Sequence, residues 1–239
     1  MSNQTFEFKQ FSIRQDKCAM KVGTDAVLLG AWVNAMNAQR ILDIGTGTGV
    51  IALMLAQKTK GHVDAIDIDE NAFMQAVENV SYSPFLNKVT VHHISLQDFA
   101  NTHQHKKYDL IVSNPPYFID SSKSTGEART KARHNDHLPF EQLLLGVLKL
   151  LDPKGKFYLI LPVKEGELFR ELAESHKLYL NKLVRVRTTT DKPEKRMMMR
   201  FEFERKSFSE KILAIELEGT RHQYTPEYME LTKDYYLAF

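Results

Sequence analysis

The sequence predicts an α/β protein built on a doubly wound, seven-stranded and mostly parallel sheet, with a small N-terminal β element. Short apolar runs alternate with segments of helical periodicity from residue 40 onward, which is the order of strands joined by helical crossovers. A glycine-rich turn follows the first of these runs at 45–49, and the run at 109–113 ends abruptly in two prolines. These features place the first and fourth strands of the sheet.

The remaining elements follow in order along the 239 residues. Alternating apolar and polar residues predict an N-terminal strand within 6–13, and a helix from about 26 is expected with Thr24 as its N-cap and Asp25 in its first turn. Strands are expected at 40–44, 63–67, 88–93, 109–113, 157–162, 179–187, 196–205 and 212–217, and helices from 50 and at 70–80, 140–151, 165–176 and 226–236. Residues 94–99 are expected to form a loop, and residues 152–155 a turn.

The composition, 43% hydrophobic and 26% charged, is typical of a soluble globular chain. No apolar run approaches the roughly 18 residues of a membrane span, and the N-terminus has no signal pattern. The single cysteine, Cys18, excludes an intrachain disulfide and argues against structural zinc. We expect one domain over 1–239, with an N-terminal extension (1–35), a core (36–205) and a C-terminal strand and helix (206–239), in a reducing cytoplasm, without metal or membrane.

Charge is distributed unevenly along the chain although the net charge is only +2. Residues 1–120 hold 10 Lys and Arg against 12 acids, whereas residues 121–239 hold 22 against 18. Nine of the basic residues lie within 182–206, against four acids. This local excess is suited to a phosphate backbone, and it is also what a solvated strand pair with alternating charges contains.

The glycine turn is the first candidate binding element. Gly45, Gly47 and Gly49 let the backbone turn tightly and approach a ligand, with a helix N-terminus just beyond. Val50 occupies the position where a dinucleotide-binding turn needs glycine or alanine, and Asp43 precedes the turn, so the pattern argues against NAD. Asp67 ends the next strand, 24 residues after Asp43, where a carboxylate can accept the ribose hydroxyls of a nucleoside cofactor; capping of the next helix is its alternative role.

The strand at 109–113 runs directly into Asn114-Pro115-Pro116-Tyr117. The prolines stop regular hydrogen bonding and hold the chain extended, which presents an amide and an aromatic ring where open α/β sheets bind ligands. An ordinary proline turn is the alternative. The polar loop from Phe118 to Leu138 follows, either as a lid over substrate or as a solvated loop.

The aspartate and three spaced glycines, followed two strands later by Asn114-Pro115-Pro116-Tyr117, resemble the class I S-adenosylmethionine-dependent methyltransferases that act on planar nitrogen atoms. The resemblance covers about residues 20–205 and implies a Rossmann-like sheet whose seventh strand is antiparallel. It implies that residues 43–49 hold the amino-acid end of the cofactor and that Asp67 holds the ribose. Asn114 and the Pro115 carbonyl would accept the N–H groups of the target amine, and Tyr117 would stack on a flipped-out base.

Segments other than these two motifs resemble the bacterial tRNA (adenine-N6)-methyltransferases that modify adenosine 37, beside the anticodon of a valine tRNA. They are 20–25, 28–32, 132–134, 224–225 and 231–236. This resemblance extends over nearly the whole chain and implies a tRNA partner, with basic surfaces on the tRNA, and we expect a monomer. The catalytic residues it implies are Asn114, Pro115, Pro116 and Tyr117, and the cofactor-binding residues are Lys21, Gly23, Thr24, Asp25, Asp43, Gly45, Gly47, Gly49, Asp67, Ile68, Ser95, Leu96, Asp98 and Asn114.

Two alternatives and one departure stay open at this point. A protein-glutamine N5-methyltransferase presents the same planar NH₂ chemistry, and a non-catalytic RNA-binding protein can keep the fold. Class I enzymes commonly carry an acid after the third strand to hold the cofactor adenine, but this chain has Ser95 there. Ser95, the Leu96 backbone or Asp98 is expected to take that role.

Overall fold

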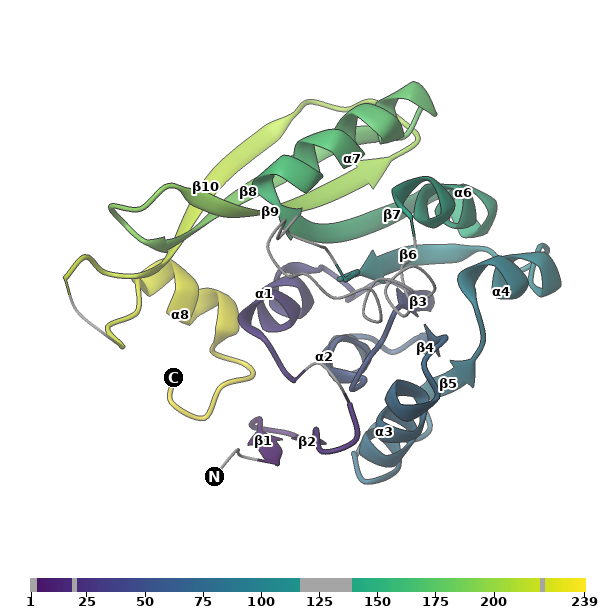
Figure 1. Ribbon diagram of the computed structural model, residues 1–239, viewed down its shortest axis with the longest axis horizontal. Helices are drawn as coiled ribbons and strands as arrows, with labels where there is room; N and C mark the ends of the chain where they lie inside the picture. The colour runs from purple at the N-terminus through teal and green to yellow at the C-terminus, as the bar shows by residue number, and fades with distance from the viewer. Residues whose placement is uncertain (1–3, 19–20, 117–138, 220–221) are drawn as a thin grey trace, which may run out of the picture.

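An eight-stranded sheet forms the centre of the computed structural model, which describes residues 4–18, 21–116, 139–219 and 222–239. The strand order is β10-β8-β9-β7-β6-β3-β4-β5, and β9 alone runs antiparallel to its neighbours within this sheet (Figure 1). The strands are β3 (Arg40–Ile44), β4 (His62–Asp67), β5 (Val89–His93), β6 (Tyr108–Ser113), β7 (Leu151–Pro162), β8 (Tyr179–Thr189), β9 (Glu194–Glu202) and β10 (Ser209–Glu216). The seven expected core strands are confirmed, with the seventh antiparallel, and β10 extends the same sheet.

Helices cover both faces of the sheet, as a doubly wound fold requires. One face carries α1 (Thr24–Trp32), α2 (Val50–Lys58), α3 (Glu70–Ser81) and α8 (Pro226–Thr232), and the other carries α4 (Leu96–Thr102), α6 (Phe140–Leu150) and α7 (Val163–Ser175) (Figure 1). The buried apolar residues accordingly form two clusters, one on each side of the sheet. The central strands read as continuous apolar runs because both of their faces are buried.

The small N-terminal β element is confirmed, but two details of this region differ from the expectation. The alternating segment 6–13 folds as a hairpin of two short antiparallel strands, β1 (Thr5–Glu7) and β2 (Ser12–Arg14), because the chain reverses where the Phe8 amide donates to the Phe11 carbonyl. The N-cap of α1 is Gly23, in extended backbone without a side-chain cap, and Thr24 is the first helical residue. Asp25 does lie in the first turn.

Two expected connections are regular structure instead. The segment expected as a loop at 94–99 starts α4 at Leu96, because the Ser95 hydroxyl accepts from the Asp98 amide as an N-cap. The expected turn at 152–155 lies inside β7, which pairs with β6 from Leu151 onward and absorbs the extra residues in a register shift. Sheet pairing thus overrides the local turn preference of Asp152-Pro153-Lys154-Gly155.

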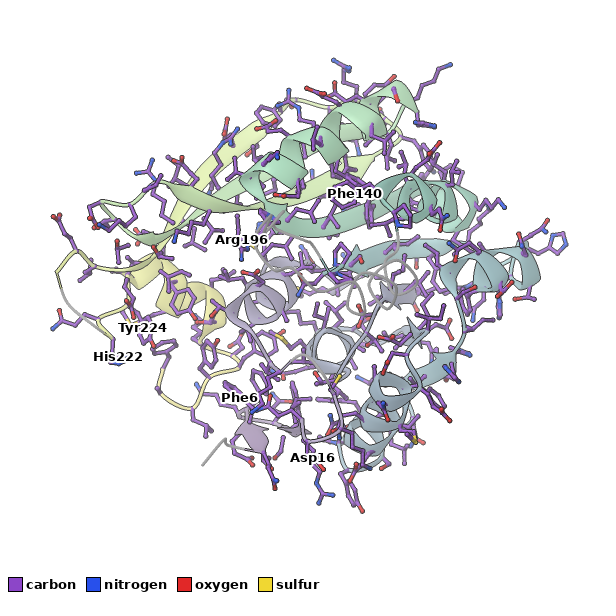
Figure 2. All side chains as sticks on the ribbon, in the orientation of Figure 1. Phe6, Asp16, Phe140, Arg196, His222 and Tyr224 are labelled. Carbon is purple, nitrogen blue, oxygen red and sulfur yellow. The ribbon has the colours of Figure 1, made fainter. Side chains whose placement is uncertain are left out.

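The N-terminal hairpin packs against the C-terminal segment. The Lys9 amide donates to the Tyr235 carbonyl over 2.8 Å, and the Phe6 ring lies 6.1 Å from that of Tyr236. The two ends of the chain lie on the same side of the molecule (Figure 1), and Figure 2 labels Phe6 on the hairpin and Tyr224 before α8. Among the described residues, no helix is long and apolar enough to cross a bilayer.

Candidate active site

The carboxyl ends of β3, β4 and β6 bring three sequence-predicted residues to one edge of the sheet. Ile44 of β3 pairs in register with Ile66 on one side and with Ser113 on the other. Gly45, Asp67 and Asn114 are the residues that follow these three paired positions, so they are neighbours at the edge. The chain leaves β3 toward β4 in one direction and reaches β6 on the other side, which is the switch point where open α/β sheets bind ligands.

The glycine turn has the backbone that the sequence predicts. Gly45, Gly47 and Gly49 have φ angles of 71°, 56° and 81°, in the left-handed region that favours glycine. The amides of Gly45 and Thr46 both donate to the Ile66 carbonyl, which ties the turn to the end of β4. A Cβ added at Gly45 or Gly47 would meet nothing within 4 Å, so the surface of this turn is open to a ligand.

Asp43 is a buried carboxylate with too few hydrogen-bond donors around it. Its side chain is 1% exposed, Oδ2 accepts from the Thr46 hydroxyl over 2.6 Å, and Oδ1 has no hydrogen-bond partner among the described residues. Burial raises the pKa of Asp43 to about 7; the Thr46 hydrogen bond opposes this rise, and the nearby charge of Asp67 adds to it. A cationic or hydrogen-donating ligand would relieve both costs.

Asp67 presents its carboxylate at the end of β4. Its Oδ2 accepts from the Gly47 amide over 2.8 Å and its Oδ1 from the Asp69 amide over 3.0 Å. Burial raises the pKa of Asp67, although these backbone donors oppose the rise. The capping role belongs to Asp69, whose Oδ1 accepts from the Ala72 amide at the start of α3. Asp67 therefore links the glycine turn to the next loop.

The candidate residues for a cofactor base gather beyond Asp67. Ile68 is 62% exposed, an unusual state for isoleucine, and its carbonyl lies 3.0 Å from Nε2 of His93. The His93 ring stacks on Phe73 at a centroid distance of 5.3 Å. These residues give the edge an apolar surface with a flat ring beside it, which suits a planar heterocycle.

The three candidates after β5 differ in what they can offer. The Ser95 hydroxyl donates to Asp98 Oδ2 over 2.6 Å, which engages the hydroxyl and one of the two carboxylate oxygens. The Leu96 side chain is buried in the core, but its amide belongs to the first helical residue of α4, where amides have no intrahelical acceptor. The Leu96 amide can therefore donate to a ring nitrogen of a base, whereas the carboxylate of Asp98 can accept from an amino group.

Asn114 follows the tightly anchored end of β6. The Ser113 hydroxyl donates to the Ile44 carbonyl over 2.9 Å, which fixes this end of β6 against β3. Asn114 Oδ1 is buried and has no hydrogen-bond partner among the described residues. Pro115 is buried and Pro116 exposed, while Tyr117 and the proposed lid at 118–138 lie outside the described residues. A buried amide oxygen that accepts no hydrogen bond lowers the stability of the fold unless a ligand supplies the donor.

The start of α1 is held at the same edge. Asp25 Oδ2 accepts from Arg196 Nε over 2.7 Å, and Arg196 pairs in register with Pro162 at the carboxyl end of β7. Figure 2 labels Arg196 close to the start of α1. Lys21, Gly23 and Thr24 are exposed beside this anchor. The ion pair thus brings the segment before α1 to the edge where the glycine turn and Asn114 lie.

Asn79 of α3 is a site-forming residue that sequence reasoning missed. Its amide nitrogen donates to the carbonyls of Arg14 and Thr48, and its oxygen accepts from the Arg14 amide. One turn earlier, Gln75 accepts from the Lys17 amide. Asn79 and Gln75 are 2% and 0% exposed, so the signal in the sequence was two amide side chains on the core face of an amphipathic helix. They fasten segment 14–17 beside the glycine turn.

Comparison with known proteins agrees with this geometry. The family model "Methyltransferase small domain" matches residues 18–161. A "tRNA1(Val) (adenine(37)-N6)-methyltransferase" of Bacteroides fragilis is 46% identical over 237 residues, covering 99% of both chains. The chain belongs to this methyltransferase family. A protein of the same name from Trichodesmium erythraeum is 46% identical over 242 residues and covers both chains completely.

Among solved structures, the methyltransferase resembles "a predicted O-methyltransferase" from Agrobacterium tumefaciens. The TM-score is 0.68 at 17% identity, with 88% of this chain and 96% of that chain covered. A likeness at this identity supports the fold alone. Within the described residues, no group of three or more His, Cys, Asp or Glu side chains is arranged to hold a metal ion.

The raised pKa of Asp43 makes a testable prediction about stability. The pKa is about 7 in the folded chain and about 4 in an unfolded one, so the folded state holds this proton more tightly. This tighter proton binding stabilises the folded state. Its contribution to the free energy of unfolding is fully present below about pH 4 and is lost as the pH rises through about 7. Asp43→Asn removes this loss.

Between pH 5 and pH 8, the free energy of unfolding of the cofactor-free parent should fall through the titration of Asp43. In Asp43→Asn this fall should be smaller by about 2–3 kcal/mol. Urea unfolding of both proteins at the two pH values measures this difference. Equal pH dependence in the two proteins would show that Asp43 titrates normally.

Proposed function

We propose that this methyltransferase transfers the methyl group of S-adenosylmethionine to N6 of adenosine 37 in tRNA1(Val). The full-length relatives carry that activity in their names. Asn114 Oδ1 is the structural observation that supports the proposal, because it is a buried acceptor at the edge with the glycine turn and has no hydrogen-bond donor among the described residues. A planar NH₂ group is the kind of donor that it lacks. We propose further that the chain acts as a monomer with a single domain.

The residues at the edge fit S-adenosylmethionine. This cofactor has an ammonium group, a sulfonium and two ribose hydroxyls. Asp43 Oδ1 is a buried acceptor with no hydrogen-bond partner in the part of the chain that the structure describes, and Asp67 is a second carboxylate whose charge acts on Asp43. We assign the amino-acid end to residues 43–49, the ribose to Asp67, and the base to the surface of Ile68 with the Leu96 amide. Lys21, Gly23, Thr24 and Asp25 would lie beside the cofactor or the target base.

The chain's own residues would favour reaction by positioning the nitrogen nucleophile. When bound, S-adenosylmethionine supplies an electrophilic methyl group. The lone pair of the adenine amino group is delocalised into the ring, which makes it a poor nucleophile. Asn114 Oδ1 and the Pro115 carbonyl would accept its two N–H groups and favour a more tetrahedral nitrogen. Neither acceptor brings a full charge toward the sulfonium, so the gain comes from orientation and electrostatics.

Proton removal needs no strongly basic side chain in this scheme. The nitrogen becomes acidic as its bond to the methyl group forms, and the proton can then pass to water. We propose that Tyr117 stacks on the flipped-out adenine, as aromatic side chains commonly do with extruded bases.

The decisive experiment incubates the protein with isotopically labelled S-adenosylmethionine and tRNA from a strain that lacks the modification. Labelled N6-methyladenosine in tRNA1(Val), identified by mass spectrometry of nucleosides and sequence-specific fragments, is the expected result. Label on protein glutamine would favour the amide methyltransferase instead. RNA binding without any transfer would favour a non-catalytic binding protein.

Asn114→Ala should reduce turnover by about 100-fold or more, the range found when one preorganised polar group at a reacting centre is removed. The Kd for S-adenosylmethionine should change by no more than about twofold, since Asn114 faces the acceptor. Single-turnover kinetics and calorimetry measure the two effects. Asn87→Ala, at an exposed turn far from the edge, is the matched control and should retain full activity.

Asn79→Ala tests the anchoring of segment 14–17 to the glycine turn. Three hydrogen bonds are lost, so we expect about 3 kcal/mol lower stability and about tenfold weaker binding of S-adenosylmethionine. Asn181→Ala is the control, because this buried amide bonds the Glu204 carbonyl and the Lys206 amide away from the edge. It should lower stability without changing cofactor affinity. Equal cofactor binding in both variants would assign Asn79 a purely structural role.

A further inference from the structure

Three cations meet on the face of the sheet that carries α1 and α8. Lys182 of β8 lies directly opposite Arg200 of β9, and Lys211 of β10 pairs with Val184, two residues further along β8. Residues paired in register project to the same face, and like charges directly opposite one another are destabilising. A ligand of opposite charge would remove this cost.

Two of these cations, Lys182 and Lys211, lack the carboxylate contacts that several basic residues of the predicted basic segment, 182–206, have. Arg185, Arg187 and Arg196 each contact a carboxylate and are neutralised locally. Lys182 and Lys211 form no ion pair with any residue that the structure describes. The hypothesis of a solvated strand pair with alternating charges therefore accounts for most of the segment, but not for Lys182 beside Lys211.

The nearest acid does not neutralise the cluster. Glu202 is buried and its carboxylate contacts both Arg200, over 3.0 Å, and Lys206, over 2.6 Å. One negative charge is thus shared by two cations. Arg200 Nε is buried without an acceptor among the described residues. Burial lowers the pKa of Lys182, and the charges of Arg200 and Lys211 lower it further. Within the described ranges, the three cations of the cluster thus outnumber the acidic side chains that contact them.

An aromatic ring completes the site. The Lys182 Nζ lies 5.7 Å from the centre of the half-buried Trp32 ring, which packs edge-on against Tyr158 at 5.3 Å. Trp32 ends α1, the helix whose first turn is held at the carboxyl edge through Asp25 and Arg196. Arg200 lies four residues beyond Arg196 along β9, about 13 Å from that edge. The cluster is therefore close enough to the catalytic edge for one RNA substrate to reach both.

We propose that Lys182, Arg200 and Lys211 form a binding site for backbone phosphates of the tRNA substrate, at a distance from the target adenosine. The proposal rests on the proposed function. Phosphate contacts position a nucleic acid and carry its salt-dependent affinity, while recognition of the base takes place elsewhere. The cluster would hold the arm of the tRNA while adenosine 37 enters the edge beside Asn114.

The test compares Lys182→Gln/Lys211→Gln with a double variant of equal charge change. Lys60→Gln/Lys154→Gln is the control, because both lysines are exposed near the opposite, amino-terminal edge of the sheet. For the first pair we expect about tenfold weaker tRNA binding in a filter assay and a smaller slope of log Kd against log salt. The turnover at saturating tRNA and the Kd for S-adenosylmethionine should be unchanged.

Lys182→Arg/Lys211→Arg should retain the affinity of the parent, which separates charge from packing, and thermal melting checks that all variants are folded. Unchanged tRNA binding in the glutamine pair, or equal weakening in the control pair, would overturn the phosphate site. Methylation of tRNA by the parent protein would still stand in either case. Failure of the parent to methylate tRNA would instead overturn the proposed function.

Discussion

The buried carboxylate of Asp43 is the constraint on which the carboxyl edge of the sheet depends. It lies in a central strand between two apolar layers, yet one of its oxygens has no hydrogen-bond partner among the described residues. Such a group costs free energy in the protein alone. The glycine turn, Asp67 and Asn114 lie at the same edge of the sheet, where a ligand can bring the missing donors.

A second buried aspartate shows what full compensation looks like. Asp64 lies on the neighbouring strand and is 3% exposed, and it accepts from His92, Lys106 and Tyr108. Burial works against its ionisation, but these hydrogen bonds outweigh burial and lower the pKa of Asp64. Asp64 is therefore stable as an internal ion within the fold. The hydrogen bonds of Asp64 all come from within the fold, which is typical of a structural charge. Asp43 has an open acceptor, which is typical of a ligand-binding charge.

Long-range anchors hold the remaining parts of the candidate site. Asn79 fastens the N-terminal segment beside the glycine turn, and Arg196 reaches from a late strand to Asp25 at the start of α1. Residues far apart in sequence thus fix one edge. The same sheet carries the cluster of Lys182, Arg200 and Lys211 on its α1 face, so the catalytic edge and the proposed phosphate site share one rigid support.

The order of the strands in the main sheet and of most helices, the glycine turn and the strand that ends in Asn114 could be predicted from the sequence alone. Apolar periodicity, glycine and proline act locally, so their consequences can be read without coordinates. Only the tertiary structure decided that Ser95 starts a helix, that residues 152–155 join β7, and that Gly23 caps α1. Within the described residues, it also decided which buried oxygens have no hydrogen-bond donor and which lysines have no acidic partner. Those properties depend on packing between distant segments, which no local pattern specifies.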